Sequence, residues 1–217
     1  MWARCPQPAR FDVLAHDPYS VGGPERRALN VDDVSIPDLG KLTRPLRVAE
    51  RTGRVRPRGR KGLWVTEFGW DSNPPDPQGV PGERHARWLE QAFYVLWREG
   101  VDAVTWFKIV DEPSGGDYGA TYQSGLYFLD GRPKPALTAF RFPFVAERTS
   151  GTRVRTWGKA PRNGAVRIQA RLGSGWRTIK TIEAHGNRVF LATMRIRGAA
   201  VLRAVVGSET SLSWNQP

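Results

Sequence analysis

The hydrophobic pattern of this sequence changes near residue 150, and that change limits the folds that the chain can adopt. Before it, three apolar runs at 11–16, 63–68 and 102–110 are nearly continuous, which is typical of parallel strands covered by helices. After it, short stretches of alternating apolar and polar residues are separated by turn residues. The pattern predicts a parallel β/α region followed by a small antiparallel sandwich.

The clearest helix of the sequence lies between the second and third apolar runs, at Glu83 to Glu99. Pro81 is suited to its start, and Gly100 follows its end, where a left-handed cap is favoured. Apolar residues recur at helical spacing at Trp88, Leu89, Ala92, Phe93 and Leu96. Strand, helix and strand in this order form a βαβ unit.

Weaker signals surround this unit. Residues 35–52 predict a helical segment that Gly40 and Pro45 should break into shorter pieces. Residues 111–128 form a long glycine-rich stretch, and loops of this kind are usually functional or mobile. A further short helix is expected at 135–140.

The charge of the chain is concentrated in its last third. The formal net charge is +12, and residues 150–217 contribute +10 of it, with 12 lysines and arginines against two glutamates. These cations alternate with apolar residues, which favours the solvated face of a sheet over an anion-binding surface. If the surface does bind a ligand, acidic glycans or anionic wall polymers are as plausible as nucleic acid.

Other composition features exclude several classes of protein. No run approaches the ~20 apolar residues of a membrane span, and residues 1–14 lack the apolar centre of a signal peptide. The single cysteine, Cys5, excludes an internal disulfide. No metal-ligand spacing or phosphate loop is present, so no metal and no cofactor are expected. The five arginines of 51–60 lack interleaved aromatic residues, so no nucleic-acid partner is expected.

Candidate functional side chains accompany each of the three apolar runs. His16 and Tyr19 come with the first run, Glu67 and Trp70 with the second, and Trp106 with the third. Because the carboxyl ends of parallel strands meet at one rim, we expect these residues to lie together. A carboxylate beside a tryptophan is typical of a sugar site. The structural alternatives are an ion-paired carboxylate, a histidine that caps a turn, and tryptophans that pack in the core.

The order of the motifs resembles the C-terminal part of the clan A glycoside hydrolases, with families 5 and 39 nearest. The histidine and tyrosine come first, then Thr-Glu-Phe-Gly at 66–69 and a tryptophan on the last strand. Gly-Leu at 125–126 and Asp-Gly-Arg-Pro-Lys-Pro-Ala at 130–136 follow. The match covers about residues 10–145 and implies the last three βα units of a (β/α)8 TIM barrel.

The resemblance also implies roles for single residues. Glu67 is expected to be the nucleophile of retaining O-glycoside hydrolysis, and His16, Tyr19, Trp70 and Trp106 are expected to bind the carbohydrate substrate. Such hydrolysis needs a second carboxylate ~5 Å away that protonates the leaving oxygen. In the clan this glutamate lies on the fourth strand, which has no counterpart here. The chain alone is therefore expected to be inactive.

Three strands cannot close a barrel. We therefore expect residues 1–149 to form an incomplete barrel that an upstream chain or segment completes, and residues 150–217 to form an immunoglobulin-like sandwich. The full-length protein is expected outside the cell or on its surface. Two alternatives remain: a noncatalytic carbohydrate-binding protein in which Glu67 only accepts hydrogen bonds, and a basic module that attaches to anionic surfaces.

Overall fold

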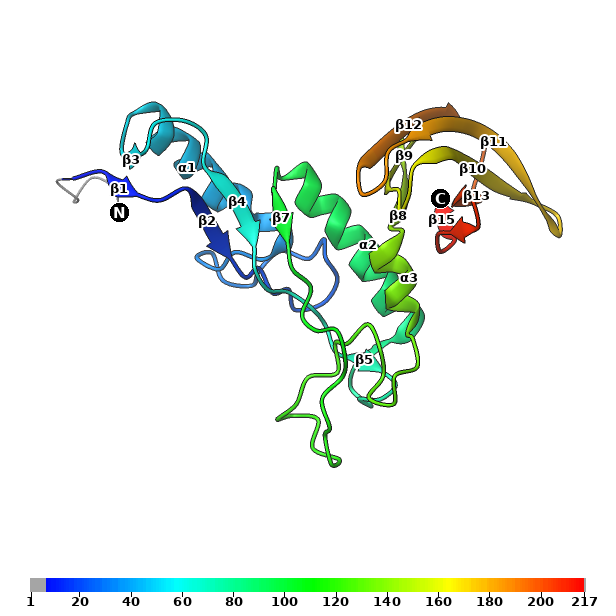
Figure 1. Ribbon diagram of the computed structural model, residues 1–217, viewed down its shortest axis with the longest axis horizontal. Helices are drawn as coiled ribbons and strands as arrows, with labels where there is room; N and C mark the ends of the chain where they lie inside the picture. The colour runs from blue at the N-terminus through cyan, green and yellow to red at the C-terminus, as the bar shows by residue number, and fades with distance from the viewer. Residues whose placement is uncertain (1–6, 217) are drawn as a thin grey trace.

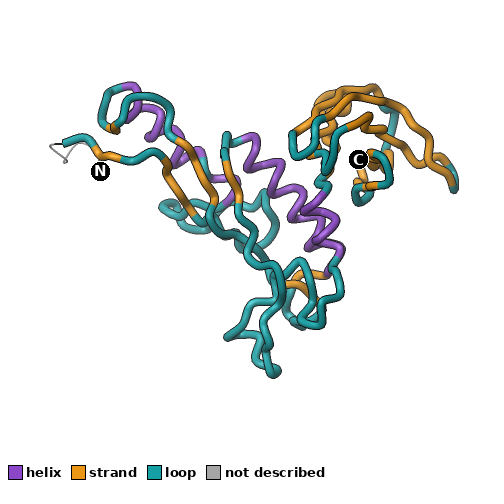
Figure 2. Tube along the Cα trace, in the orientation of Figure 1, coloured by secondary structure: helices purple, strands orange, loops and turns teal. Residues whose placement is uncertain are grey.

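The structure is a computed structural model that describes residues 7–216, so Cys5 lies outside the described residues. Figure 1 shows a β/α region that holds the N-terminal part of the chain and an antiparallel region that holds the C-terminal part. A long loop between β7 (Ala103–Val104) and α3 (Pro135–Arg141) extends away from both, as Figure 2 shows in teal. The chain is thus a mixed α/β protein with several separate sheets.

A three-stranded parallel sheet organises the β/α region. The strands β2 (Val13–His16) and β7 both pair with β4 (Gly62–Val65). Each apolar run that predicts a strand therefore contributes one, although every strand is shorter than its run. On one face of this sheet Leu63 and Val65 are almost completely buried, and Val65 packs in the core that includes residues of α2 (Gly82–Arg98).

The opposite face of the same sheet is open in the described part of the chain. Ala15, Trp64 and Ala103 lie side by side in the register of the three strands, and all three are exposed. Trp64 has 45% of its surface exposed. Parallel sheets are normally covered on both faces, so this face differs from that of a closed β/α fold.

Two helices lie beside the sheet, and one of them corrects an expectation. The structure confirms the predicted helix as α2, which buries Ala86, Leu89 and Ala92. The segment expected to break forms a 3-10 helix, η2 (Ile36–Asp38), and one continuous helix, α1 (Gly40–Arg51). The division expected at Gly40 is confirmed, since η2 ends just before it and α1 begins there. The break expected at Pro45 was wrong: proline is tolerated inside α1, where burial of Leu46 and Ala49 offsets the hydrogen bond that it removes.

Short strand pairs complete the β/α region. Strand β1 (Ala9–Arg10) pairs in parallel with β3 (Val55–Arg56). Strand β5 (Ser72–Asn73) pairs with β6 (Val80–Pro81) just ahead of α2. These pairs hold the loops on either side of the central sheet.

The antiparallel region consists of two sheets that share one apolar core. One sheet has the order β12-β9-β8, and the other has the order β11-β10-β13-β14, with β15 also paired to β13. Their bounds are β8 (Phe144–Ser150), β9 (Arg153–Lys159), β10 (Gly164–Leu172), β11 (Gly175–Ala184), β12 (Val189–Arg195), β13 (Ala200–Val206), β14 (Glu209–Thr210) and β15 (Trp214–Gln216). The core takes Phe144, Val154 and Phe190 from the first sheet and Val166, Ile168 and Leu202 from the second. The domain boundary expected at 149/150 falls at the end of β8.

Helix α2 joins the two regions through polar contacts. Glu90 is completely buried and accepts a hydrogen bond from the backbone N–H of Phe144 at 3.3 Å. Tyr94 Oη donates to Glu147 Oε2 at 2.6 Å. Burial raises the pKa of Glu90 to about 8, although Arg87 and the Phe144 N–H both act to lower it.

Candidate functional site

The candidate site begins with a hydrogen bond between two strand ends. Strand β4 ends at Val65, and Glu67 follows it at the carboxyl edge of the sheet. Tyr19, three residues beyond β2, donates from its hydroxyl to Glu67 Oε2 at 3.2 Å. Tyr19 is 45% exposed. The parallel pairing of β2 and β4 thus brings these two predicted residues together at an accessible position.

The electrostatics of this pair keep the tyrosine protonated. Partial burial raises the pKa of the Tyr19 phenol, and the charge and hydrogen bond of Glu67 raise it further. Asp17 and Tyr122 contribute smaller increases to the same pKa. The phenol therefore remains a hydrogen-bond donor to the carboxylate across the physiological pH range.

Asp17 places a second carboxylate near this pair. Its Oδ1 accepts a hydrogen bond from Thr66 Oγ1 at 2.7 Å, and its carbonyl accepts one from the backbone N–H of Tyr19 at 2.9 Å. Asp17 is exposed. A catalytic acid of a glycosidase is normally held protonated by apolar surroundings, so Asp17 lacks the environment that this role requires.

Two aromatic residues outside the predicted set also lie here. The backbone N–H of Phe107 donates to Phe68 O at 3.1 Å, which fixes Phe107 next to the strand end that carries Glu67. The ring of Tyr122 meets the Phe107 ring edge to face, with centroids 5.0 Å apart. Tyr122 is 51% exposed. The sequence does show that Tyr122 lies in the long glycine-rich stretch. Because a loop has no side-chain periodicity, the sequence could not show that this ring faces the site.

We call Asp17, Tyr19, Glu67, Phe107 and Tyr122 the Glu67 site. Gly69 allows its close assembly, because a Cβ atom there would lie 2.5 Å from the carbonyl oxygen of Phe107. Any larger residue at 69 would push the end of β4 away from the segment that follows β7.

The two predicted tryptophans lie in the core below the site. Trp106 is 5% exposed, and its Nε1 donates to Ser124 O at 2.8 Å. Trp70 is 9% exposed, and its Nε1 donates to Ser20 O at 3.0 Å and to Gly22 O at 2.8 Å. Trp106 packs edge to face on Phe68, with ring centroids 5.0 Å apart. A sugar ring has no access to these two indoles here, whereas Tyr19 and Tyr122 are exposed.

His16 lies at one side of the site. Its Nε2 is 2.8 Å from Val34 O, so the ring is tied to the loop that leads to η2. His16 and Tyr19 both line a polar cleft of about 370 Å³, together with Asp17, Arg27, Asn30 and Asp33. The structure therefore places the histidine beside the tyrosine but turns its ring nitrogen toward backbone.

A buried ion pair anchors the long loop that carries Tyr122. Lys134 Nζ lies 2.6 Å from Asp111 Oδ1, 2.8 Å from Ser72 Oγ and 2.8 Å from Gln123 O. The side chains of Lys134 and Asp111 are 3% and 1% exposed. Burial lowers the pKa of Lys134, while the Asp111 carboxylate acts to raise it. The loop is thus held at both ends, close to the Glu67 site.

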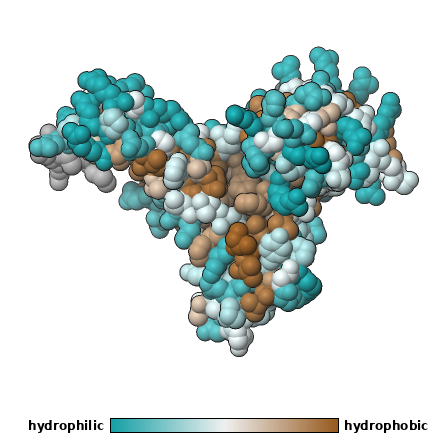
Figure 3. Space-filling view, in the orientation of Figure 1, coloured by the Kyte–Doolittle hydropathy of each residue, from teal (hydrophilic) through white to brown (hydrophobic). Residues whose placement is uncertain are grey.

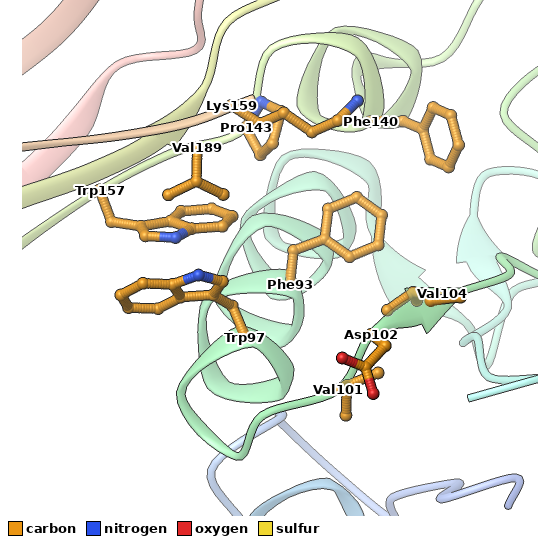
Figure 4. A pocket seen from close by; sticks show the side chains of 11 residues that line it. Phe93, Trp97, Val101, Asp102, Val104, Phe140, Pro143, Trp157, Lys159 and Val189 are labelled. Carbon is orange, nitrogen blue, oxygen red and sulfur yellow. The ribbon is translucent and has the colours of Figure 1, made fainter. Parts of the chain in front are cut away.

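An apolar hollow lies elsewhere, at the junction of the two regions. Figure 4 shows it between α2, α3 and the antiparallel strands, with Trp97 and Trp157 on one wall. Its volume is about 260 Å³. Asp102 lies at the edge of the hollow, and its carboxylate accepts hydrogen bonds from Arg60 Nη1 at 2.8 Å and from the backbone N–H of Leu63 at 2.9 Å. No residue of the Glu67 site lines this hollow. Figure 3 shows hydrophobic residues gathered in the middle of the molecule, between two hydrophilic parts.

In residues 7–216 no group of three or more histidine, cysteine, aspartate or glutamate side chains is arranged to hold a metal ion. No helix within that range is both long and apolar enough to span a bilayer.

Comparison with solved structures gives the fold relationship. No protein-family model matches the sequence, and no curated protein matches it. A family 39 glycoside hydrolase from Bacteroides cellulosilyticus WH2 superposes with a TM-score of 0.50 at 14% identity, covering 83% of this chain and 44% of that one. β-Glucuronidases from Ruminococcus gnavus (17% identity, TM-score 0.36, 59% of this chain and 22% of that one) and Parabacteroides merdae (13%, 0.37, 95% and 29%) superpose less well.

The chain therefore has a glycosidase-like fold at low sequence identity. It spans less than half the length of the family 39 enzyme.

Proposed function

We propose that the chain carries the nucleophile part of a retaining O-glycoside hydrolase of the family 5/39 type. The observation that supports this most directly is the hydrogen bond from Tyr19 Oη to Glu67 Oε2 at the carboxyl edge of a parallel sheet. The phenol donates to the carboxylate and orients it, and attack on an anomeric carbon requires a carboxylate oxygen that is held in place.

The chemistry assigns roles to three members of the site and to the neighbouring His16. Glu67 attacks the anomeric carbon, and the glycosidic oxygen leaves with its bonding electrons. Tyr19 holds the attacking carboxylate in place, and the exposed ring of Tyr122 offers an apolar surface to a sugar face. His16 contributes to the wall of the neighbouring cleft.

The second carboxylate comes from a further β/α segment, which also completes the barrel. The open face of the sheet at Ala15, Trp64 and Ala103 gives such a segment a place to pack. In this proposal residues 1–149 are the last three βα units, residues 150–217 are an immunoglobulin-like sandwich, and the complete enzyme acts outside the cell or on its surface. The present residues alone do not turn over natural glycosides, because a poor leaving group needs an acid.

An activated substrate tests the nucleophile without the acid. A 2-deoxy-2-fluoro glycoside with a dinitrophenolate leaving group needs no protonation, so Glu67 should displace the phenolate and retain the sugar as an ester. Intact-mass measurement of the full chain with a panel of such glycosides should show one added sugar, and peptide mapping should place it on Glu67.

Matched variants define the outcome of this test. Glu67→Gln should abolish the adduct, while Glu25→Gln, at an exposed glutamate, should leave it unchanged. Tyr19→Phe should slow labelling by about tenfold, the worth of one hydrogen bond of ~1.4 kcal/mol. Reversible sugar binding without an adduct would instead support a noncatalytic carbohydrate-binding protein.

A further inference from the structure

The outer face of the second antiparallel sheet carries a cluster of arginines around one tryptophan. Side chains of β10 alternate, so that Val166, Ile168 and Ala170 enter the core while Arg167, Gln169 and Arg171 point outward. In the register of the neighbouring strands, Arg203 of β13 lies opposite Gln169, and Trp176 of β11 lies opposite Arg171. We call Arg167, Gln169, Arg171, Trp176 and Arg203 the Trp176 platform.

Contacts within the platform fix one guanidinium group over the indole. The central carbon of the Arg203 guanidinium lies over the Trp176 ring, 4.1 Å from its centroid. Arg203 Nε donates to Gln169 Oε1 at 2.9 Å. Because Gln169 and Trp176 both hold this side chain, its planar fork is oriented before any ligand arrives.

The positive charge of the platform is not neutralised within the region. Residues 150–217 contain two acidic side chains, Glu183 and Glu209, and Glu209 is paired with Arg141 at 3.0 Å. None of the ion pairs found among residues 7–216 includes an arginine of the platform. Like charges on neighbouring strands cost stability, so the structure keeps this charge without an internal partner.

The two sheets of the antiparallel region differ in what covers their outer faces. The sheet β12-β9-β8 packs Val145 and Trp157 against Tyr94 of α2. Strands β10 and β11 lie on the side away from the parallel sheet β2-β4-β7, as Figure 1 shows. Arg167 and Arg171 are exposed there. The platform is therefore an accessible surface of the molecule.

We propose that the Trp176 platform binds an acidic polysaccharide through the carboxylates of its uronate residues. Guanidinium forks match carboxylates in a bidentate manner, and the amide of Gln169 can bond to sugar hydroxyls. Single-stranded nucleic acids are usually held by several aromatic rings in succession, whereas the platform offers one ring that is already covered by Arg203. Charge complementarity and the polar groups between the arginines favour the glycan.

Binding at the Trp176 platform would keep the Glu67 site close to the acidic polysaccharide. Linking a second binding surface to a site raises the effective concentration of substrate there. The platform lies in the other region of the molecule and shares no residue with the Glu67 site. Its binding is therefore independent of whether Glu67 is a nucleophile.

The test measures binding of the full chain to polygalacturonate and to its fully methyl-esterified form by isothermal titration calorimetry. Polygalacturonate should bind, and the neutral ester should bind at least about tenfold more weakly, since the charge-assisted contacts are lost. The double variant Arg171→Gln/Arg203→Gln should weaken polygalacturonate binding by about tenfold. Thermal melting of each variant checks that it remains folded.

The control removes the same charge from the other sheet. Arg153 and Arg195 are exposed and face each other in the register of β9 and β12, so Arg153→Gln/Arg195→Gln should change the affinity by less than about twofold. An equal loss in this control, equal binding of the methyl ester, or tighter binding of single-stranded DNA or anionic lipid vesicles would overturn the proposal. Adduct formation at Glu67 and polygalacturonate binding are measured separately, and because the platform shares no residue with the Glu67 site, failure of one leaves the other standing.

Discussion

The β/α region and the antiparallel region place their charged side chains in opposite ways. Among residues 7–216, every buried charged side chain lies before β8; Asp38, Lys61, Asp76, Glu90, Asp111 and Lys134 are examples. The buried polar residues of the antiparallel region are the uncharged Thr156, Ser211 and Gln216. The first region thus buries charged groups, among them the ion pair of Lys134 and Asp111, while the second depends on apolar packing and leaves its arginines for the surface.

The largest expected effect comes from the buried ion pair of the first region. Lys134→Met would leave the Asp111 carboxylate buried without its cation, and breaking such a pair costs about 3 to 5 kcal/mol. The free energy of unfolding in urea, followed by tryptophan fluorescence, measures this loss.

The same substitution in the antiparallel region provides the control. Burial lowers the pKa of Lys159, and its ammonium contacts Asn187 Oδ1 at 3.3 Å. Because Lys159 forms no ion pair with a carboxylate within residues 7–216, Lys159→Met should be neutral or stabilising. Equal destabilisation by both substitutions would contradict the contrast between the regions.

An intermediate effect is expected from the carboxyl group at the junction. Burial raises the pKa of Glu90 from 4.5 to about 8, so the folded protein keeps a proton that the unfolded chain has already lost. The free energy of unfolding should therefore fall as pH rises from 4.5 to 8. In Glu90→Gln this contribution to the slope should vanish.

Unfolding at several pH values between 6.5 and 9 measures this difference. The lower limit avoids His85, because burial lowers its pKa from 6.5 to about 4 and its contribution to stability is lost as pH falls through that range. Identical pH slopes in the wild-type chain and in Glu90→Gln would show that the carboxyl group is not held protonated.

The smallest effect is expected on the open face of the parallel sheet. Trp64 is 45% exposed, so Trp64→Thr should change stability by no more than about 0.5 kcal/mol. Its neighbour Leu63 is completely buried on the other face, and Leu63→Ala should cost about 2 to 5 kcal/mol. Urea unfolding of both variants compares the faces directly, and a large cost at Trp64 would mean that this face is covered in solution.

Much of the secondary structure could be predicted because it follows from local patterns. The spacing of apolar residues located α2 to within one residue of each end, and the continuous apolar runs located β2, β4 and β7. The continuity of α1 could not be predicted, because it depends on tertiary burial of Leu46 and Ala49.

The candidate site was predictable only in part. The contact between Tyr19 and Glu67 was expected because both follow neighbouring parallel strands. The burial of Trp106 was weighed only as an alternative, because side-chain alternation does not extend past the end of a strand. Tyr122 reaches the site from a loop, and its position depends on the ion pair that Lys134 forms with Asp111, two residues far from the site in sequence.

The two indoles at the junction have a practical consequence. Trp97 belongs to α2 and Trp157 to β9, and their ring centroids lie 6.2 Å apart at an angle of 46°. Indoles this close couple their electronic transitions and give a strong near-ultraviolet circular dichroism signal. The intensity of that signal should therefore fall if the two regions of the chain separate, and it can be measured without an added label.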